Sequence, residues 1–216
     1  MIKVKRYIVS VMQTNCYVLE DTETGKILIV DPGDTSKELD SVIGRLNPGA
    51  VSYILLTHGH FDHIRAAERY RVLTGAKIVI CEDEQAFTKE NSLNLSELFI
   101  EGGIPPFQAD VLLRDHQAIS FGNTQINMIQ TPGHTKGSVC YRMENLLFTG
   151  DTLMKETVGR TDLPTGNFEQ LKLSLKKLAS LKKDYRIYPG HGDTTTLSYE
   201  KNHNLYLGKM DYDDLY

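Results

Sequence analysis

The stretch Thr57-His58-Gly59-His60-Phe61-Asp62-His63 contains three histidines and one aspartate. It follows the apolar run 51–56, which predicts a strand covered on both faces. Imidazoles and a carboxylate, crowded into six residues, are the ligands that zinc-class ions prefer. Side chains of a strand alternate between faces, so only a turn at Gly59 can aim all four at one point. We predict a metal-binding turn; a surface histidine-rich turn is the alternative.

Three later residues follow short apolar strands in the same way. His134, Asp151 and His191 each come directly after such a predicted strand, and each has a glycine next to it. A lone histidine after a strand is usually structural, but strand ends that meet at one edge of a sandwich would bring these residues to the first cluster. Together they make seven candidate ligands, a reasonable number for two ions that share a carboxylate and a hydroxide.

The motif His-x-His-x-Asp-His, with its downstream His, Asp and His, resembles the metallo-β-lactamase superfamily over the range from about Asn15 to His191. The resemblance implies an α/β (α+β) fold, a four-layer αββα sandwich with a dinuclear metal site. It also implies a ligand set: His58, His60 and His134 for the first metal, Asp62, His63 and His191 for the second, and Asp151 as the bridge.

The same resemblance implies two further roles. Asp62 would also act in catalysis by hydrogen-bonding and aiming the hydroxide shared by the metals. Asp31 matches a position that orients the site, although a buried aspartate that caps a turn is an equally good interpretation. The expected metals are two divalent ions, zinc first, with iron or manganese suited to the same ligands.

Within the superfamily, the sequences 149–153 and 159–162 resemble the short bacterial glyoxalase II-type hydrolases, which cleave S-acylglutathione thioesters. Arg160 stands near a glutathione-contacting lysine of those relatives, and a guanidinium can bind a carboxylate through two hydrogen bonds. A loop-bracing ion pair between Arg160 and Asp162 is the equal alternative. We expect no counterpart of the C-terminal helical domain with which longer relatives hold glutathione, and residues 64–67 replace the usual small residues after the motif.

Two other functions compete with thioester hydrolysis. One is the persulfide dioxygenase branch, a mononuclear iron oxidoreductase that shares the Gly-Arg-Thr-Asp stretch and would use His58, His134 and Asp151. The other is a non-catalytic scaffold that keeps the metal for stability. The complete ligand set favours the hydrolase, and the metal content per chain discriminates between hydrolase and dioxygenase.

The remaining sequence predicts two blocks of strands and helices that pack as two sheets with helices outside. Strands are expected at 2–9, 16–20, 26–31, 51–56, 77–81, 118–121, 124–130, 138–142, 146–148 and 185–188, and helices at 36–46, 62–73, 168–181 and 199–207. We predict a single domain over 1–216, with 82–115 as a lid-like insertion and 195–216 as a short C-terminal tail.

Composition narrows the partners and the cellular location. A net charge of −4 disfavours nucleic acid and anionic membranes as partners, which leaves a small-molecule thioester or ester substrate. The start of the chain has no signal-peptide pattern, and three widely spaced cysteines do not resemble a disulfide framework. We expect a cytoplasmic protein with buried, reduced thiols. His116 and His203 lie in polar surroundings and are expected to have no role.

Overall fold

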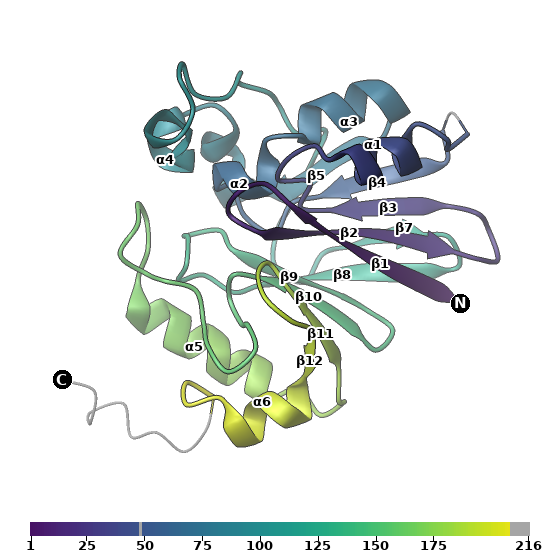
Figure 1. The fold of residues 1–216 in the computed structure, drawn as a ribbon. Helices are drawn as coiled ribbons and strands as arrows, with labels where there is room; N and C mark the ends of the chain where they lie inside the picture. The colour runs from purple at the N-terminus through teal and green to yellow at the C-terminus, as the bar shows by residue number, and fades with distance from the viewer. Residues whose placement is uncertain (48, 208–216) are drawn as a thin grey trace.

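The computed structural model describes residues 1–47 and 49–207, which form two facing β-sheets with helices on their outer sides (Figure 1). The first sheet has the order β1-β2-β3-β4-β5-β6, and the second has the order β12-β11-β10-β9-β8-β7. The first contains β1 (Ile2–Val9), β2 (Thr14–Asp21), β3 (Ile27–Val30), β4 (Val51–Leu55), β5 (Lys77–Cys81) and β6 (Val111–Leu113). The second contains β7 (Ala118–Phe121), β8 (Thr124–Gln130), β9 (Val139–Met143), β10 (Leu146–Gly150), β11 (Arg186–Pro189) and β12 (Thr195–Thr196).

Helices cover both outer faces, so the predicted four-layer αββα class is confirmed (Figure 1). Over the first sheet and its edge lie α1 (Lys37–Ile43), α2 (Phe61–Ile64), α3 (Ala67–Thr74) and α4 (Asn91–Asn94), with the 3₁₀ helices η1 (Glu82–Thr88) and η2 (Ser96–Leu98). Against the second sheet lie α5 (Phe168–Ala179) and α6 (Leu197–His203). No helix within 1–47 and 49–207 has the length and apolarity needed to cross a bilayer.

Three apolar clusters fill the three spaces between the four layers. In β3, Ile27 and Ile29 pack toward the helices, whereas Leu28 and Val30 pack between the sheets. This period of two explains why the sequence is continuously apolar there: both faces of the strand are covered. The cysteines are buried and unpaired, one in each cluster: Cys16, Cys81 and Cys140. The expected buried free thiols are therefore present.

Some predicted elements differ from those observed. The single helix expected over 62–73 is two helices, because the chain turns at Ala66, whose N–H donates to the carbonyl of Pro32 over 2.9 Å instead of continuing a helix. Two short strands, β6 and β12, were not predicted. Of the expected tail 195–216, residues 195–203 form β12 and α6, and residues 208–216 lie outside the described residues.

Candidate metal centre

All seven predicted ligands lie in segments that follow strands, and the structure brings them together from both sheets. The first sheet supplies four of them through the loop after β4 and the short helix α2: His58, His60, Asp62 and His63. The second sheet supplies one residue after each of β8, β10 and β11: His134, Asp151 and His191. Ligand atoms within each of three overlapping groups lie within 4.8 Å of one another.

The first group contains His58, His60 and His134, all buried. Nδ1 of His60 lies 2.9 Å from Nε2 of His134. His134 Nδ1 lies 2.7 Å from the carbonyl oxygen of Arg160, which can only accept, so this nitrogen carries the proton. His134 Nε2 therefore carries a lone pair and lies beside His60 Nδ1, so these two nitrogens are placed to bind one metal.

The second group contains Asp62, His63 and His191. Nε2 of His63 lies 3.2 Å from Nε2 of His191, and Asp62 Oδ2 lies 3.4 Å from the same His191 atom. The hydroxyl of Thr14 donates to Asp62 Oδ2 over 2.9 Å and fixes that carboxylate. Side-chain nitrogens and oxygens thus converge on a second point beside the first.

Asp151 lies between the two groups. Its Oδ1 is 3.6 Å from His63 Nε2, and its Oδ2 is 3.7 Å from His134 Nε2 and 3.5 Å from His191 Nε2. Gly190 makes this position accessible, since a Cβ there would overlap with Asp151 Oδ1. One carboxylate therefore faces ligands of both groups, which is the placement that a bridging role requires.

The unsatisfied atoms of the site test whether a metal fits it. Within the described chain, the buried side-chain atoms without a hydrogen-bond partner are His58 Nε2, His60 Nε2 and Asp151 Oδ1. Unpaired buried polar atoms are rare and costly in folded proteins. All three belong to predicted ligands, and a bound cation would satisfy His58 Nε2 and Asp151 Oδ1. His60 faces the first group through Nδ1, so its Nε2 points away from that position. The residues present therefore fit a dinuclear site for divalent ions.

Electrostatics agree with this fit. Burial lowers the pKa of His58, and burial together with His134 lowers that of His60 to about 3, so both imidazoles are neutral ligands. Burial would raise the pKa of Asp62, but His63 and His191 outweigh it and keep the carboxylate ionised. Burial likewise opposes protonation of His63, but Asp62 and Asp151 raise its pKa to about 10. In the metal-free protein His63 holds a proton that a metal at Nε2 would displace.

Asp31 stabilises the ligand turn through hydrogen bonds. Its Oδ1 accepts the backbone N–H of Thr57 over 2.8 Å, and its Oδ2 accepts the Thr57 hydroxyl over 2.7 Å. The same Oδ2 lies 3.1 Å from Nδ1 of His63. Asp31 therefore caps the turn and also orients a predicted ligand, so both roles considered for it in the sequence agree with its contacts.

Glu84, in η1, was not singled out by the sequence and joins the two ligand loops. Its buried carboxylate accepts the N–H of Gly59 over 2.7 Å and that of Gly137 over 2.8 Å. Gly59 lies between two ligands of the first sheet, and Gly137 lies three residues after His134. The available signal was weak, since Glu84 ends the acidic run 82–84 after β5 and nothing in the sequence separates it from its neighbours.

An open pocket of about 410 Å³ gives access to the centre. It is lined by Met12, His60, Phe61, Asp62, Leu95, Leu98, Phe99, His134, Asp151, Met154, Gly159, Arg160, Leu163 and His191. Arg160 is on this wall, but its guanidinium makes two hydrogen bonds to Asp162, at 2.6 and 2.7 Å. His116 and His203 are in none of the ligand groups found in the described chain.

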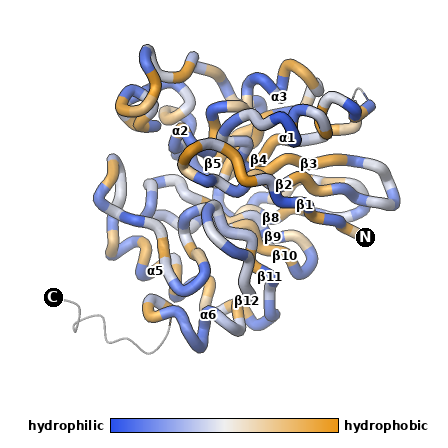
Figure 2. Tube along the Cα trace, viewed as in Figure 1, coloured by the Kyte–Doolittle hydropathy of each residue, from blue (hydrophilic) through white to orange (hydrophobic). Residues whose placement is uncertain are grey.

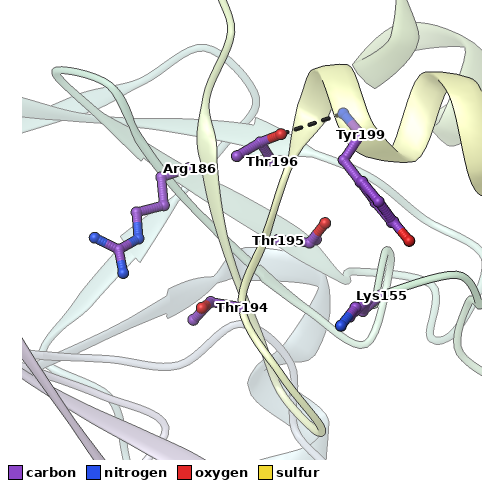
Figure 3. Close-up of a pocket in the computed structure, with 6 residues that line it drawn as sticks. All are labelled: Lys155, Arg186, Thr194, Thr195, Thr196 and Tyr199. Atoms are coloured by element: carbon purple, nitrogen blue, oxygen red, sulfur yellow. Dashed lines mark hydrogen bonds between the residues drawn. The ribbon is translucent and has the colours of Figure 1, made fainter.

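A second hollow lies beside β12 and contains none of the predicted ligands (Figure 3). Two of its hydroxyl groups have structural partners: Thr196 caps α6 by accepting the N–H of Tyr199, and Thr195 donates to Glu200. Lys155 and Arg186 lie on its sides. These contacts stabilise the end of the sheet and the start of α6.

Comparisons with known proteins identify the family. A family model described as the metallo-β-lactamase superfamily matches residues 9–191. A probable metallo-hydrolase of Streptococcus pyogenes serotype M6 is 34% identical over 214 residues, which cover 96% of this chain and 91% of that protein. Hydroxyacylglutathione hydrolase GloC of Haemophilus influenzae is 32% identical over 203 residues, covering 92% of this chain and 95% of GloC.

Solved structures share the whole architecture. The BLEG-1 B3 metallo-β-lactamase superposes with a TM-score of 0.86 at 32% identity, covering 95% of this chain and 99% of that one. TTHA1623, solved in a di-iron-bound form, gives 0.80 at 30% identity, with 94% and 100% covered. ETHE1 from Myxococcus xanthus gives 0.75 at 27% identity, with 94% and 83% covered. The chain therefore belongs to the metallo-β-lactamase superfamily, which consists mostly of hydrolytic metalloenzymes.

Proposed function

We propose that this protein is a dinuclear metal-dependent hydrolase that cleaves small thioesters or esters, with S-acylglutathione as the leading substrate class. The observation that carries the proposal is the convergence of seven ligand side chains, five of which line an open pocket and three of which have unsatisfied buried atoms. Zinc is the proposed metal, because neutral imidazoles and carboxylates suit it.

Two divalent ions held there would supply a water molecule of lowered pKa and polarise the carbonyl of the substrate. Asp62 lies on the pocket wall with Oδ2 fixed by Thr14, so it is placed to accept a hydrogen bond from the attacking water and aim it. Asp31 keeps His63 oriented. The three cysteines are buried within the apolar clusters, so no thiol nucleophile faces the pocket.

Thioesters of glutathione are favoured because GloC, a relative over nearly the whole chain, is a hydroxyacylglutathione hydrolase. We propose that Arg160 contacts the carrier thiol, since it lines the pocket. Its ion pair with Asp162 must then be shared with the ligand, and such an exposed pair contributes little energy. We expect a high KM for S-lactoylglutathione and only a modest loss of kcat/KM when glutathione is trimmed to a smaller thiol.

The test combines metal analysis of purified protein with a thioester-hydrolysis assay. We expect about two divalent ions per chain, and metal-dependent release of free thiol from S-lactoylglutathione. One iron per chain, with oxygen consumption on a persulfide and no thioester cleavage, would replace the proposal by a dioxygenase function. A preference for intact glutathione that survives Arg160→Ala would show that another residue holds the carrier.

A further inference from the structure

One side of the pocket is built from apolar side chains. Apart from the candidate ligands, its wall consists of Gly159, Arg160 and seven apolar residues: Met12, Phe61, Leu95, Leu98, Phe99, Met154 and Leu163. Phe61 and Phe99 stack with ring centroids 4.9 Å apart, which joins the segment after α4 to the ligand helix α2. Figure 2 shows apolar residues in the turn between β1 and β2 and in the segment around α4.

Three of these seven apolar side chains are exposed. Leu98 is 70% exposed, Phe99 is 59% exposed, and Met12 is 41% exposed. Exposed single apolar residues are common, but a contiguous group around a pocket marks a surface that binds an apolar partner.

The segment that carries Leu95, Leu98 and Phe99 has its polar and apolar side chains reversed relative to the usual arrangement. Asn94 and Ser96 are fully buried, and they bond inward: Asn94 Nδ2 donates to the carbonyl of Phe87, and Ser96 Oγ accepts the N–H of Ile104. Polar residues of this kind are mostly found outside and leucines inside.

Leu95 itself adopts a left-handed backbone conformation, with φ of 67°, which leucine adopts at an energetic cost. The inward hydrogen bonds of its neighbours hold this conformation in place. The segment is thus folded so that its leucines and phenylalanine face the pocket opening rather than the core.

The small number of charged side chains on the pocket wall also indicates an apolar ligand. Among the residues that line the pocket outside the candidate ligands, the only charged side chain is Arg160, which is the proposed contact of the carrier thiol. Glutathione and the other common thiol carriers end in charged or amide groups, which gain nothing from an apolar wall. The apolar arm of a thioester substrate is therefore its acyl group.

We infer that the wall formed by Met12, Leu95, Leu98 and Phe99 is an acyl-binding subsite, which selects thioesters with apolar acyl chains longer than the lactoyl group. This inference rests on the proposed thioester hydrolysis and specifies its substrate class. A lactoyl group is short and carries a hydroxyl, so it would leave most of this wall in contact with water.

The experiment holds the thiol constant and varies the acyl chain. The zinc-loaded protein is assayed with S-acetyl-, S-butanoyl-, S-hexanoyl- and S-lactoylglutathione. Burial of one methylene contributes about 0.8 kcal/mol, which is about fourfold in kcat/KM per carbon at full contact. We expect kcat/KM to rise about two- to fourfold per added carbon, with hexanoyl, three carbons longer, about eightfold or more above lactoyl.

Matched variants locate the effect. Leu98→Ser and Phe99→Ser should each reduce the rise per carbon to half or less. Val72→Ser on α3 and Leu173→Ser on α5 change residues that are 74% and 66% exposed and outside the pocket lining, and should preserve it. Circular dichroism and zinc content check that each variant is folded and loaded.

The outcomes separate this inference from the function on which it rests. Cleavage of the whole series with no dependence on chain length, or a dependence unchanged in both wall variants, would overturn the acyl subsite and leave the hydrolase proposal standing. Failure to cleave any thioester in the series would overturn the proposed function itself.

Discussion

The two sheets contribute to the metal centre in different ways. The first sheet delivers four ligands within six residues, through a turn and a four-residue helix after one strand. The second sheet delivers one ligand from each of three strand ends, and the first of these ligands, His134, is 57 residues before the last, His191. The first set is arranged by local backbone geometry, whereas the second exists only when the sheet has formed.

Both metal groups draw on both sets. His134 completes the group of His58 and His60, and His191 completes the group of Asp62 and His63. Neither sheet alone provides a complete site, so metal binding reports on how well the two sheets are held together. The residues that connect the sets should therefore show the largest effects on mutation.

Asp151→Ala should have the largest effect, because this carboxylate faces His63, His134 and His191. Its loss would leave two cations without the negative charge between them. We expect loss of at least one metal per chain and a fall in activity on the order of a hundredfold or more, since even outer contacts of metal ligands contribute about 10–100-fold. Metal analysis and thioester turnover measure both. Asp193→Ala, two residues beyond His191 and exposed, is the control; retention of both metals in Asp151→Ala would refute the bridging role.

Glu84→Gln should have the next largest effect, because Glu84 bonds the two ligand loops to each other through Gly59 and Gly137. An amide can accept from only one of these N–H groups and presents its own N–H₂ to the other. An unsatisfied buried donor costs about 1–3 kcal/mol, and we expect unfolding free energy to fall by that amount, with metal affinity weakened about tenfold.

The control for this variant is Glu82→Gln in the same helix, where the carboxylate is exposed and paired with Arg114. A surface pair of this kind contributes about 0–1 kcal/mol. Equal effects of the two variants on metal affinity, measured by competition with a chelator, would show that Glu84 does not position the ligand loops.

The buried carboxyl group of Glu84 should also make the free energy of unfolding depend on pH. Burial raises its pKa to about 7 in spite of hydrogen bonds from Thr135, Gly137 and Gly59. Between the ordinary value of 4.5 and about 7, the folded protein holds this proton more tightly than the unfolded chain, so stability falls as pH rises through this window.

The slope of this fall is at most about 1.4 kcal/mol per pH unit. Urea unfolding of metal-free wild type and Glu84→Gln at pH 5, 6, 7 and 8 isolates it. The stability difference between the two should decrease from pH 5 to 7 and then level off. A difference that stays constant over the whole range would contradict the assignment.

Much of the fold follows from local patterns. The apolar runs of β3, β4 and β5 are long enough to indicate strands covered on both faces, and the structure places them at the centre of the first sheet. The strands β6 and β12 were missed because three and two residues carry too little periodicity. The break at Ala66 was missed because its cause is a tertiary hydrogen bond to Pro32.

In the candidate site, too, local patterns identify some residues, and tertiary contacts determine the others. Glycines beside strand-end histidines and aspartates, as at His134 and His191, indicate the ligands without any knowledge of the sheets. Glu84 and the reversed segment around Leu95 were not predicted, because their roles depend on which neighbours the folded chain brings to them. Sequence patterns therefore identify groups that bind a metal better than groups that position it or bind substrate.

The smallest effects are expected at the two histidines outside both sets. His203 lies on α6, where its ring stacks on Tyr199 at 4.1 Å and Nδ1 donates to the Tyr199 carbonyl over 2.9 Å. His116 is 78% exposed in a turn beside Asp115. Neither side chain reaches the pocket, so His203→Ala and His116→Ala should retain metal content and keep turnover within about twofold of wild type, as surface substitutions usually do. The decisive measurement is the metal content per chain. Loss of one metal equivalent in either variant would mean that the centre has a ligand outside the seven, and that the two sheets do not supply all of its ligands as the geometry indicates.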